Sequence, residues 1–128
     1  MNLGVSEKVT SFTGLRAWQQ ARALTSDIYQ LSQSFPPEEK FGLTSQMRRS
    51  SISVAGNIAE GFSRNGIKDK CQFYSIALGS LTETLSHAYI ACDLGYIKQP
   101  ELQQLEPKVI ELHKMINGLI KSARSRMQ

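Results

Sequence analysis

The sequence predicts an all-α fold, an antiparallel up-down-up-down four-helix bundle that forms one domain over residues 1–128. Apolar residues recur every three or four positions through four long blocks, which is the spacing of one helix face. No block shows the sustained alternation of apolar and polar residues that is typical of a strand. The breaks between the blocks are short, and short connections join antiparallel neighbours in helix bundles. We expect residues 1–11 to be flexible and residues 124–128 to form a basic tail.

The first two helices are separated by a pair of prolines. The first helix is expected over about residues 15–33, and Pro36 and Pro37 end it because proline removes a backbone donor and disfavours helical geometry in the residue before it. The second helix begins near residue 38 or 44, with Thr44 as a candidate N-cap, and runs to about residue 62.

Glycine and proline also set the limits of the last two helices. The third helix is expected over about residues 68–93 and stops at Gly95, since glycine is favoured just beyond a helix C-terminus. The fourth opens around Pro100, because proline is well accommodated in a first turn. Pro107 lies inside the fourth apolar pattern, so it either kinks this helix or marks its true start.

Composition excludes several classes of protein. The chain is 41% hydrophobic and 20% charged, unlike disordered or low-complexity chains. No apolar run reaches the roughly 18 residues that a membrane span needs, and the N-terminus lacks the features of a secretory signal. We therefore expect a cytoplasmic protein with no membrane contact. Cys71 and Cys92 lack the spacing of a disulfide framework or a zinc site, so no metal or other cofactor is expected.

The second predicted helix carries one polar stripe. Its members advance by three or four residues and fall on one side of the helix: Gln46, Arg49, Ser53, Asn57, Glu60 and Arg64. Such a stripe can be a solvated helix face, a ladder of charge-assisted hydrogen bonds or an anion site. It can equally be an interface between subunits, and the pattern leaves these alternatives open.

The third predicted helix is apolar on two sides. Ile76 and Ile90 share a face with Glu83, opposite the main core arc. One bundle needs one apolar stripe per helix, so the second arc favours contact with another copy over deep burial within one chain.

Arg48 falls at the edge of the apolar arc of the second helix, where a guanidinium needs a carboxylate. Glu83 is the candidate partner of Arg48 or Arg49.

No catalytic constellation is present in the sequence. Glu60 and Glu83 could be read as paired carboxylates, but acid/base chemistry also needs a pocket and perturbed pKa values, which the sequence does not reveal. His87 and His113 stand on different predicted helices without the i, i+4 spacing of a zinc motif. We therefore expect no enzyme activity.

The charge balance favours an anionic partner. Lysine and arginine number 15 against 11 acidic residues, which gives a net charge of +4 and a pI near 9.2. Cations gather at Arg64, Lys68 and Lys70, in the turn between the second and third helices, and in the acid-free segment 121–128. Basic clusters of this kind attract phosphate backbones, although solubility and helix dipoles explain them as well.

The chain resembles a known family over nearly its whole length, residues 12–123. The similarity is carried by FGLTSQMRRSSISVAGNIAEGFSR (41–64), FYSIALGSLTE (73–83) and LGYI (94–97), and the opening LRAWQQARALTSDIYQLSQSFPPEEKFGL is also similar. These segments resemble the 23S rRNA intervening-sequence protein family of small bacterial four-helix bundles. The motif positions of the family correspond here to Gln46, Arg48, Arg49, Asn57, Glu60, Gly61, Arg64, Gly79, Ser80 and Glu83.

The resemblance implies a left-handed antiparallel bundle that assembles into a homopentamer, and it implies no settled biochemical role. The family fold is also similar to the accessory variability proteins of diversity-generating retroelements, which are pentamers that bind nucleic acid and a reverse transcriptase. Fold analogy of this kind is a weak warrant for function.

The expected function is that of a non-enzymatic, self-associating bundle whose repeated basic patches bind RNA or DNA, and a protein partner is a further candidate. The expected phosphate contacts are Arg49, Arg64, Lys68 and Lys70, with Glu60 and Glu83 orienting the arginines. The alternative is a structural or protein-interaction module that binds no nucleic acid. In that case the residues Gln46, Arg48, Asn57, Glu60 and Glu83 form a structural polar stripe or a subunit interface.

Overall fold

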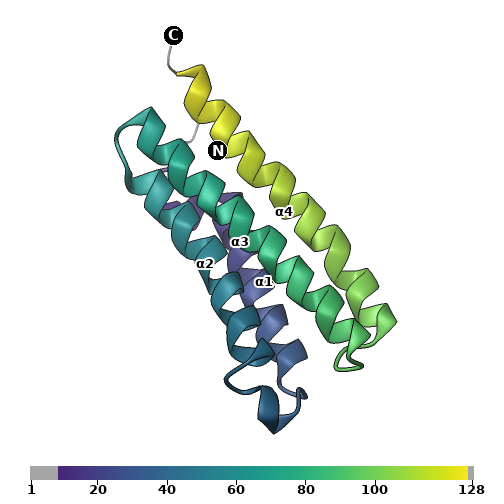
Figure 1. The fold of residues 1–128 in the computed structure, drawn as a ribbon. Coiled ribbons are helices and arrows are strands. Elements are labelled where there is room, and N and C mark those ends of the chain that lie inside the picture. The colour runs from purple at the N-terminus through teal and green to yellow at the C-terminus, as the bar shows by residue number, and fades with distance from the viewer. Residues whose placement is uncertain (1–8, 127–128) are drawn as a thin grey trace.

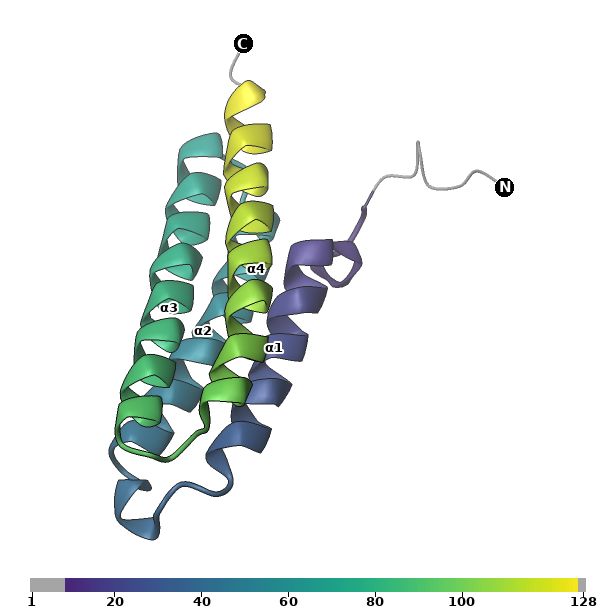
Figure 2. The same ribbon diagram turned by 90° about the vertical axis from the view of Figure 1, so that its right-hand side faces the viewer.

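The chain folds into four long helices that run alternately up and down (Figures 1 and 2). The computed structural model describes residues 9–126. Its helices are α1 (Arg16–Ser32), α2 (Leu43–Ser63), α3 (Ile67–Asp93) and α4 (Gln99–Ser125), and short 3-10 helices η1 (Phe12–Gly14) and η2 (Pro37–Glu39) precede α1 and α2. No residue between 9 and 126 lies in a strand. The predicted all-α four-helix bundle is confirmed.

The expectations for the two ends of the chain stay predictions. In the segment 124–128, expected as a basic tail, Arg124 and Ser125 are the last residues of α4, and residues 127–128 lie outside the described residues. Of residues 1–11, expected to be flexible, residues 1–8 lie outside the described residues.

Helix α3 ends as the sequence predicts. Gly95 has a φ of +80°, a conformation that side chains disfavour and glycine adopts freely. This turn lets the backbone N–H of Tyr96 donate to the carbonyl of Ala91 at 2.8 Å, which satisfies one of the last carbonyls of α3. Helix α4 then begins at Gln99 and continues through Pro107 without interruption, so Pro107 does not mark its start.

The start of α2 differs from the prediction that Thr44 is the N-cap. The helix begins at Leu43 after Gly42, and its first backbone N–H donates to Oε1 of Glu39 at 3.0 Å. The other carboxylate oxygen of Glu39 accepts a hydrogen bond from the Tyr96 hydroxyl at 2.9 Å. One carboxylate from η2 therefore caps α2 and also ties it to the loop between α3 and α4.

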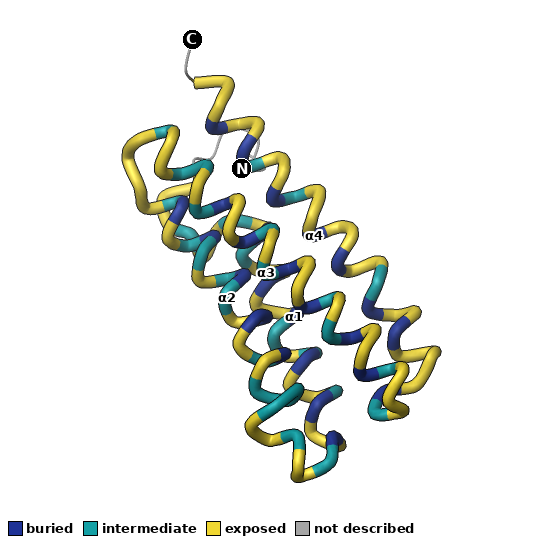
Figure 3. Tube along the Cα trace, in the orientation of Figure 1, coloured by how far each residue is buried: buried dark blue, intermediate teal, exposed yellow. Residues whose placement is uncertain are grey.

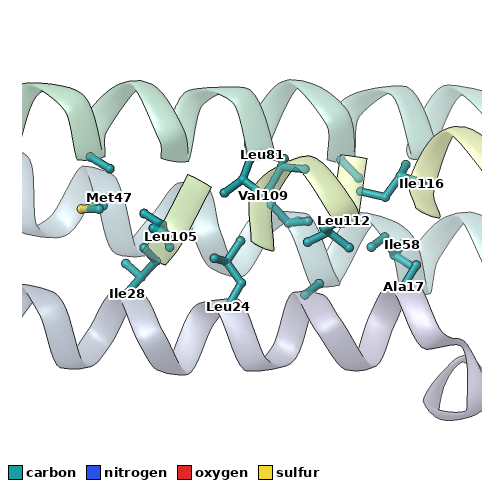
Figure 4. Packing of buried hydrophobic residues seen from close by; sticks show 14 of the residues in the cluster. Ala17, Leu24, Ile28, Met47, Ile58, Leu81, Leu105, Val109, Leu112 and Ile116 are labelled. Carbon is teal, nitrogen blue, oxygen red and sulfur yellow. The ribbon is translucent and has the colours of Figure 1, made fainter. Parts of the chain in front are cut away.

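Each helix turns one apolar face inward. Buried residues line the inner side of every helix along its length, while the outer sides are exposed (Figure 3). Leu24 and Ile28 of α1 interdigitate with Leu105 and Leu112 of α4 in the centre of the bundle (Figure 4). The largest fully buried side chains are Ile28, Met47, Val54, Ile58, Leu81, Thr84, Leu112 and Ile116. These positions repeat at the helical period that predicted the fold.

The helices are not equally close to one another. Helices α2 and α3 make the most extensive contact of any pair, whereas α1 and α4 make the least extensive one among the long helices that pack as neighbours.

Near the turn between α2 and α3, Gly61 packs directly on a neighbour. A Cβ atom on Gly61 would lie 2.6 Å from Cε1 of Tyr74 and 3.2 Å from the carbonyl oxygen of Lys70. Only glycine fits at this position.

We expect Gly61→Ala to lower the free energy of unfolding by about 1–3 kcal/mol, because the buried Tyr74 ring and a backbone carbonyl must both move. Gly118→Ala is the matched control, since a Cβ at Gly118 in α4 would meet nothing within 4 Å. This control should raise stability by about 0.5–1 kcal/mol, the usual gain of alanine over glycine in a helix. Urea denaturation of both variants measures the difference, and equal effects would contradict the close packing at Gly61.

The hydrogen bond to Glu39 raises the pKa of the Tyr96 phenol above its usual 10.0, with smaller contributions from burial and from the charges of Glu39 and Glu38. At a pH between the two pKa values, the Tyr96 phenol is protonated in the folded chain and ionised in the unfolded chain. Its contribution to folding stability is therefore complete below about pH 10 and is lost as the pH rises through the pKa of the folded state. Urea midpoints measured between pH 8 and pH 11 should fall more steeply for the wild type than for Tyr96→Phe. Parallel curves would show that the Tyr96 hydroxyl carries no such linkage.

Candidate functional site

A ladder of small polar side chains joins α2 to α3. The hydroxyls of Ser50 and Thr84 are buried and lie 2.8 Å apart, and those of Ser53 and Ser80 lie 2.9 Å apart. The amide of Asn57 donates to the carbonyl and to the hydroxyl of Ser53 at 2.8 and 2.9 Å. One member of the predicted polar stripe, Ser53, therefore bonds to α3, and Asn57 supports it from within α2.

A shallow groove lies beside this ladder. Its volume is about 110 Å³, and it is lined by Gln46, Arg49, Ser50, Ser53, Ser80 and Glu83. The structure thus brings Gln46 and Arg49 of α2 together with Glu83 of α3, as the sequence led us to expect for residues of one site. Arg49 and Glu83 do not approach within ion-pair distance, since none of the ion pairs among residues 9–126 joins these two side chains.

Arg48 corrects the expectation of an ion pair with Glu83. Its guanidinium turns toward α1, where Nε donates to the Ser32 hydroxyl at 2.8 Å and Cζ lies 4.5 Å from the centre of the Tyr29 ring. A serine hydroxyl and an aromatic face therefore take the place of the predicted carboxylate. Arg48 is a contact between α1 and α2 and does not belong to the groove.

Glu83 is paired instead with His87, one helical turn further along α3. Nε2 of His87 lies 3.7 Å from Oε2 of Glu83, and Nδ1 lies 3.4 Å from the Ser50 hydroxyl. This set has the residue types of a serine hydrolase triad, but Ser50 is buried and its hydroxyl is already engaged by the Met47 carbonyl and by Thr84. It is therefore a structural cluster. The four-residue spacing of Glu83 and His87 is the sequence feature that indicates their contact, because residues four apart are neighbours on a helix.

The cations of the turn between α2 and α3 are held in different ways. Arg64 pairs with Glu60 at 2.7 Å, and its guanidinium lies 4.7 Å from the centre of the Phe73 ring. Lys68 is exposed to solvent. Lys70 donates to the carbonyls of Gly61 and Phe62 at 3.2 and 2.7 Å, so it caps the C-terminus of α2.

These cations share one end of the bundle with the last turns of α4 (Figure 1). We call this the basic end, and its cations are Arg64, Lys68, Lys70, Lys121, Arg124 and Arg126. Burial, and then the charge of Arg126, lowers the pKa of Lys70 below its usual 10.5, which places the two side chains near each other. Glu60 and Asp69 are the carboxylates of the same helix ends.

Acidic residues gather at the opposite end, around η2 and the loop between α3 and α4: Glu38, Glu39, Asp93, Glu101 and Glu106. Lysines such as Lys40 and Lys98 offset only part of this charge. The modest net charge of the chain is therefore unevenly distributed along the bundle. Arg49 does not belong to the basic end, because fifteen residues separate it from Arg64, about 22 Å along α2 at 1.5 Å per residue.

The second apolar face predicted for α3 is open to solvent in the single chain. Ile76 and Ile90 are each 45% exposed, and Leu94 is 53% exposed. Ile52 of α2 is 49% exposed. These large aliphatic side chains are not used in the core of their own bundle.

Neither a metal cluster nor a membrane span is found among the described residues. Within 9–126, no three histidine, cysteine, aspartate or glutamate side chains are grouped so that they could hold a metal ion. None of the helices in this part of the chain is both long and apolar enough to cross a membrane.

Comparison with models of protein families shows to which family this chain belongs. The model of the 23S rRNA-intervening sequence protein family matches residues 13–118, from η1 to the second half of α4. The chain belongs to this family. The resemblance noted from the sequence is confirmed.

A solved structure shares the fold of this 23S rRNA-intervening sequence protein. It is a protein of unknown function from the S23 ribosomal protein family of Bacteroides thetaiotaomicron, with a TM-score of 0.73 and 20% sequence identity. The similarity covers 82% of this chain and 98% of that chain. A comparison with curated proteins gives no match.

Some of the candidate residues lie inside the region that matches the family model, and others lie outside it. The groove between α2 and α3, with Arg49 and Glu83, lies inside the matched region, and so does the turn that carries Arg64 and Lys68. Residues after 118 lie outside it. The last turns of α4, which complete the basic end, are thus a feature of this chain beyond the family match.

Proposed function

We propose that this member of the 23S rRNA-intervening sequence protein family is a non-enzymatic protein that binds the phosphates of RNA or DNA at its basic end. The observation that carries the proposal is the concentration of cations on the ends of three helices. Clustered lysines and arginines release counterions from a nucleic acid, and this release supplies most of the affinity of non-specific binding.

The carboxylates of the basic end offset little of its charge. Glu60 neutralises Arg64 in an exposed ion pair, and such a pair is worth little in water and can be exchanged for a phosphate. Lys68 is exposed and forms no ion pair with a described carboxylate. Arg64 and Lys68 are therefore the central phosphate contacts in this proposal. Lys70 instead caps the C-terminus of α2, and Arg49 lines the groove between α2 and α3.

We further propose that copies of the chain associate through the exposed apolar face of α3, as the expected pentamer requires. Three large aliphatic side chains, Ile76, Ile90 and Leu94, lie along this face and are close to half exposed or more. Gly79 lies on the same face and adds no side chain that would keep a second helix away. Association would repeat the basic end and raise the avidity for a long polyanion.

A purely structural module is the competing proposal. The hydroxyl ladder supports it, because Ser53 of the polar stripe bonds to Ser80 of α3 and Asn57 bonds to Ser53 within α2. This reading assigns no ligand to the basic end. The two proposals differ in whether nucleic acid binds at low salt.

Replacing both central cations, as in Arg64→Gln with Lys68→Gln, should weaken binding to a single-stranded RNA. The slope of log affinity against log salt should become shallower by about 0.7 for each phosphate that the variant no longer neutralises. The control is Lys40→Gln with Lys98→Gln at the opposite end, which changes the net charge by the same amount. Fluorescence anisotropy across a salt series measures both. No binding by the wild type at low salt would favour the structural module, and equal effects in the two variants would contradict binding at the basic end.

Charged substitutions on the exposed face of α3 should reduce the size of the assembly. In Ile76→Asp with Ile90→Asp, a carboxylate would have to be desolvated at each contact, so dissociation to monomers is expected. Ile110→Asp is the control, because Ile110 is 54% exposed on α4, away from this face. Sedimentation velocity gives the mass of each variant. A wild type that is monomeric at micromolar concentration would contradict the association.

A further inference from the structure

A cavity of about 510 Å³ opens at the basic end, where α1 begins and α4 ends. This is within the range of roughly 300–1,000 Å³ that is usual for small-molecule sites. Leu15, Phe62, Tyr74 and Leu119 give it a largely apolar lining, and Lys70 and Arg126 supply cations. Its lining comes from the segment before α1, the last turn of α2, the first turns of α3 and the last turns of α4.

The two cations of this cavity have no counterion among the described residues. Lys70 and Arg126 are absent from the ion pairs of residues 9–126, and Lys70 is partly desolvated beside Arg126. Two of the three N–H donors of the Lys70 ammonium are used by the carbonyls of Gly61 and Phe62. One donor of Lys70 and the guanidinium of Arg126 are thus left for an anion, which would relieve the repulsion between them.

Tyr74 adds a third polar group. Its side chain belongs to the core, the residue is only 3% exposed, and it lines the cavity. Burial raises the pKa of this phenol, so it remains a hydrogen-bond donor at neutral pH. A phenol on the wall of a cavity can donate a hydrogen bond to a ligand that offers an acceptor.

We propose that this cavity binds a single amphiphilic carboxylate, with its hydrocarbon body against Leu15, Phe62 and Leu119 and its head near Lys70, Arg126 and Tyr74. A hydrocarbon chain suits the apolar lining, and a carboxylate accepts hydrogen bonds from both the cations and the phenol. A nucleobase suits it less, because several polar atoms on its edge would be buried without partners. The site is separate from the phosphate contacts at Arg64 and Lys68.

Calorimetric titration of the full chain with decanoate, without nucleic acid, tests this proposal. We expect saturable binding of one decanoate per chain and much weaker binding of decanol, which lacks the charge. Arg126→Ala should weaken decanoate binding about tenfold, as is usual for the removal of a charged hydrogen bond. Tyr74→Phe, which keeps the ring and removes the hydroxyl, should weaken it by a smaller factor.

Arg124→Ala is the matched control, because it removes the same charge from the same turn of α4 but does not line the cavity. Its affinity for decanoate should equal that of the wild type. The combination of Arg64→Gln with Lys68→Gln should also bind decanoate normally, which separates this site from the proposed nucleic-acid function. Absence of saturable binding, binding of many decanoates per chain, or equal weakening in Arg124→Ala and Arg126→Ala would overturn the proposal.

Discussion

The close contact between α2 and α3 includes two pairs of hydroxyl groups beside the apolar core. Ser50 with Thr84, and Ser53 with Ser80, let the two helices lie close together while every fully enclosed polar side-chain atom among the described residues keeps a partner. The close pair occupies one side of the bundle, and the aliphatic core lies between it and the other two helices. Among the neighbouring long helices, α1 and α4 make the least extensive contact.

Helix topology also determines the charge distribution. An up-and-down bundle brings the C-termini of α2 and α4 together with the N-terminus of α3, so basic residues that are far apart in the sequence gather at one end. Arg64, Lys121, Arg124 and Arg126 lie at the C-termini of α2 and α4, where cations complement the helix dipoles, whereas Lys68 and Lys70 lie in the first turn of α3, where they do not. Lys70 instead caps the C-terminus of α2, and it also lines the cavity.

Features that depend on local sequence could be predicted, whereas contacts between distant residues could not. Apolar periodicity placed the four helices, and Gly95 marked the end of α3 because its backbone conformation suits glycine. The cap on α2 was missed because its partner Glu39 lies before the helix and is oriented by the distant Tyr96. Arg48 was assigned a carboxylate on charge alone, but the partner within reach in the fold is Ser32. The cavity is lined by residues from three helices and from the segment before α1, so no local sequence pattern could predict it.

The uneven charge along the bundle gives the molecule an electric dipole that runs roughly parallel to its helices. In the field of a strand of phosphates, such a rod turns before contact, with the turn between α2 and α3 leading and η2 trailing. The encounter is then end-on. Under the proposed function, the footprint on a nucleic acid would be set by the cross-section of the bundle, and neighbouring molecules could bind side by side on one strand with their acidic ends away from it.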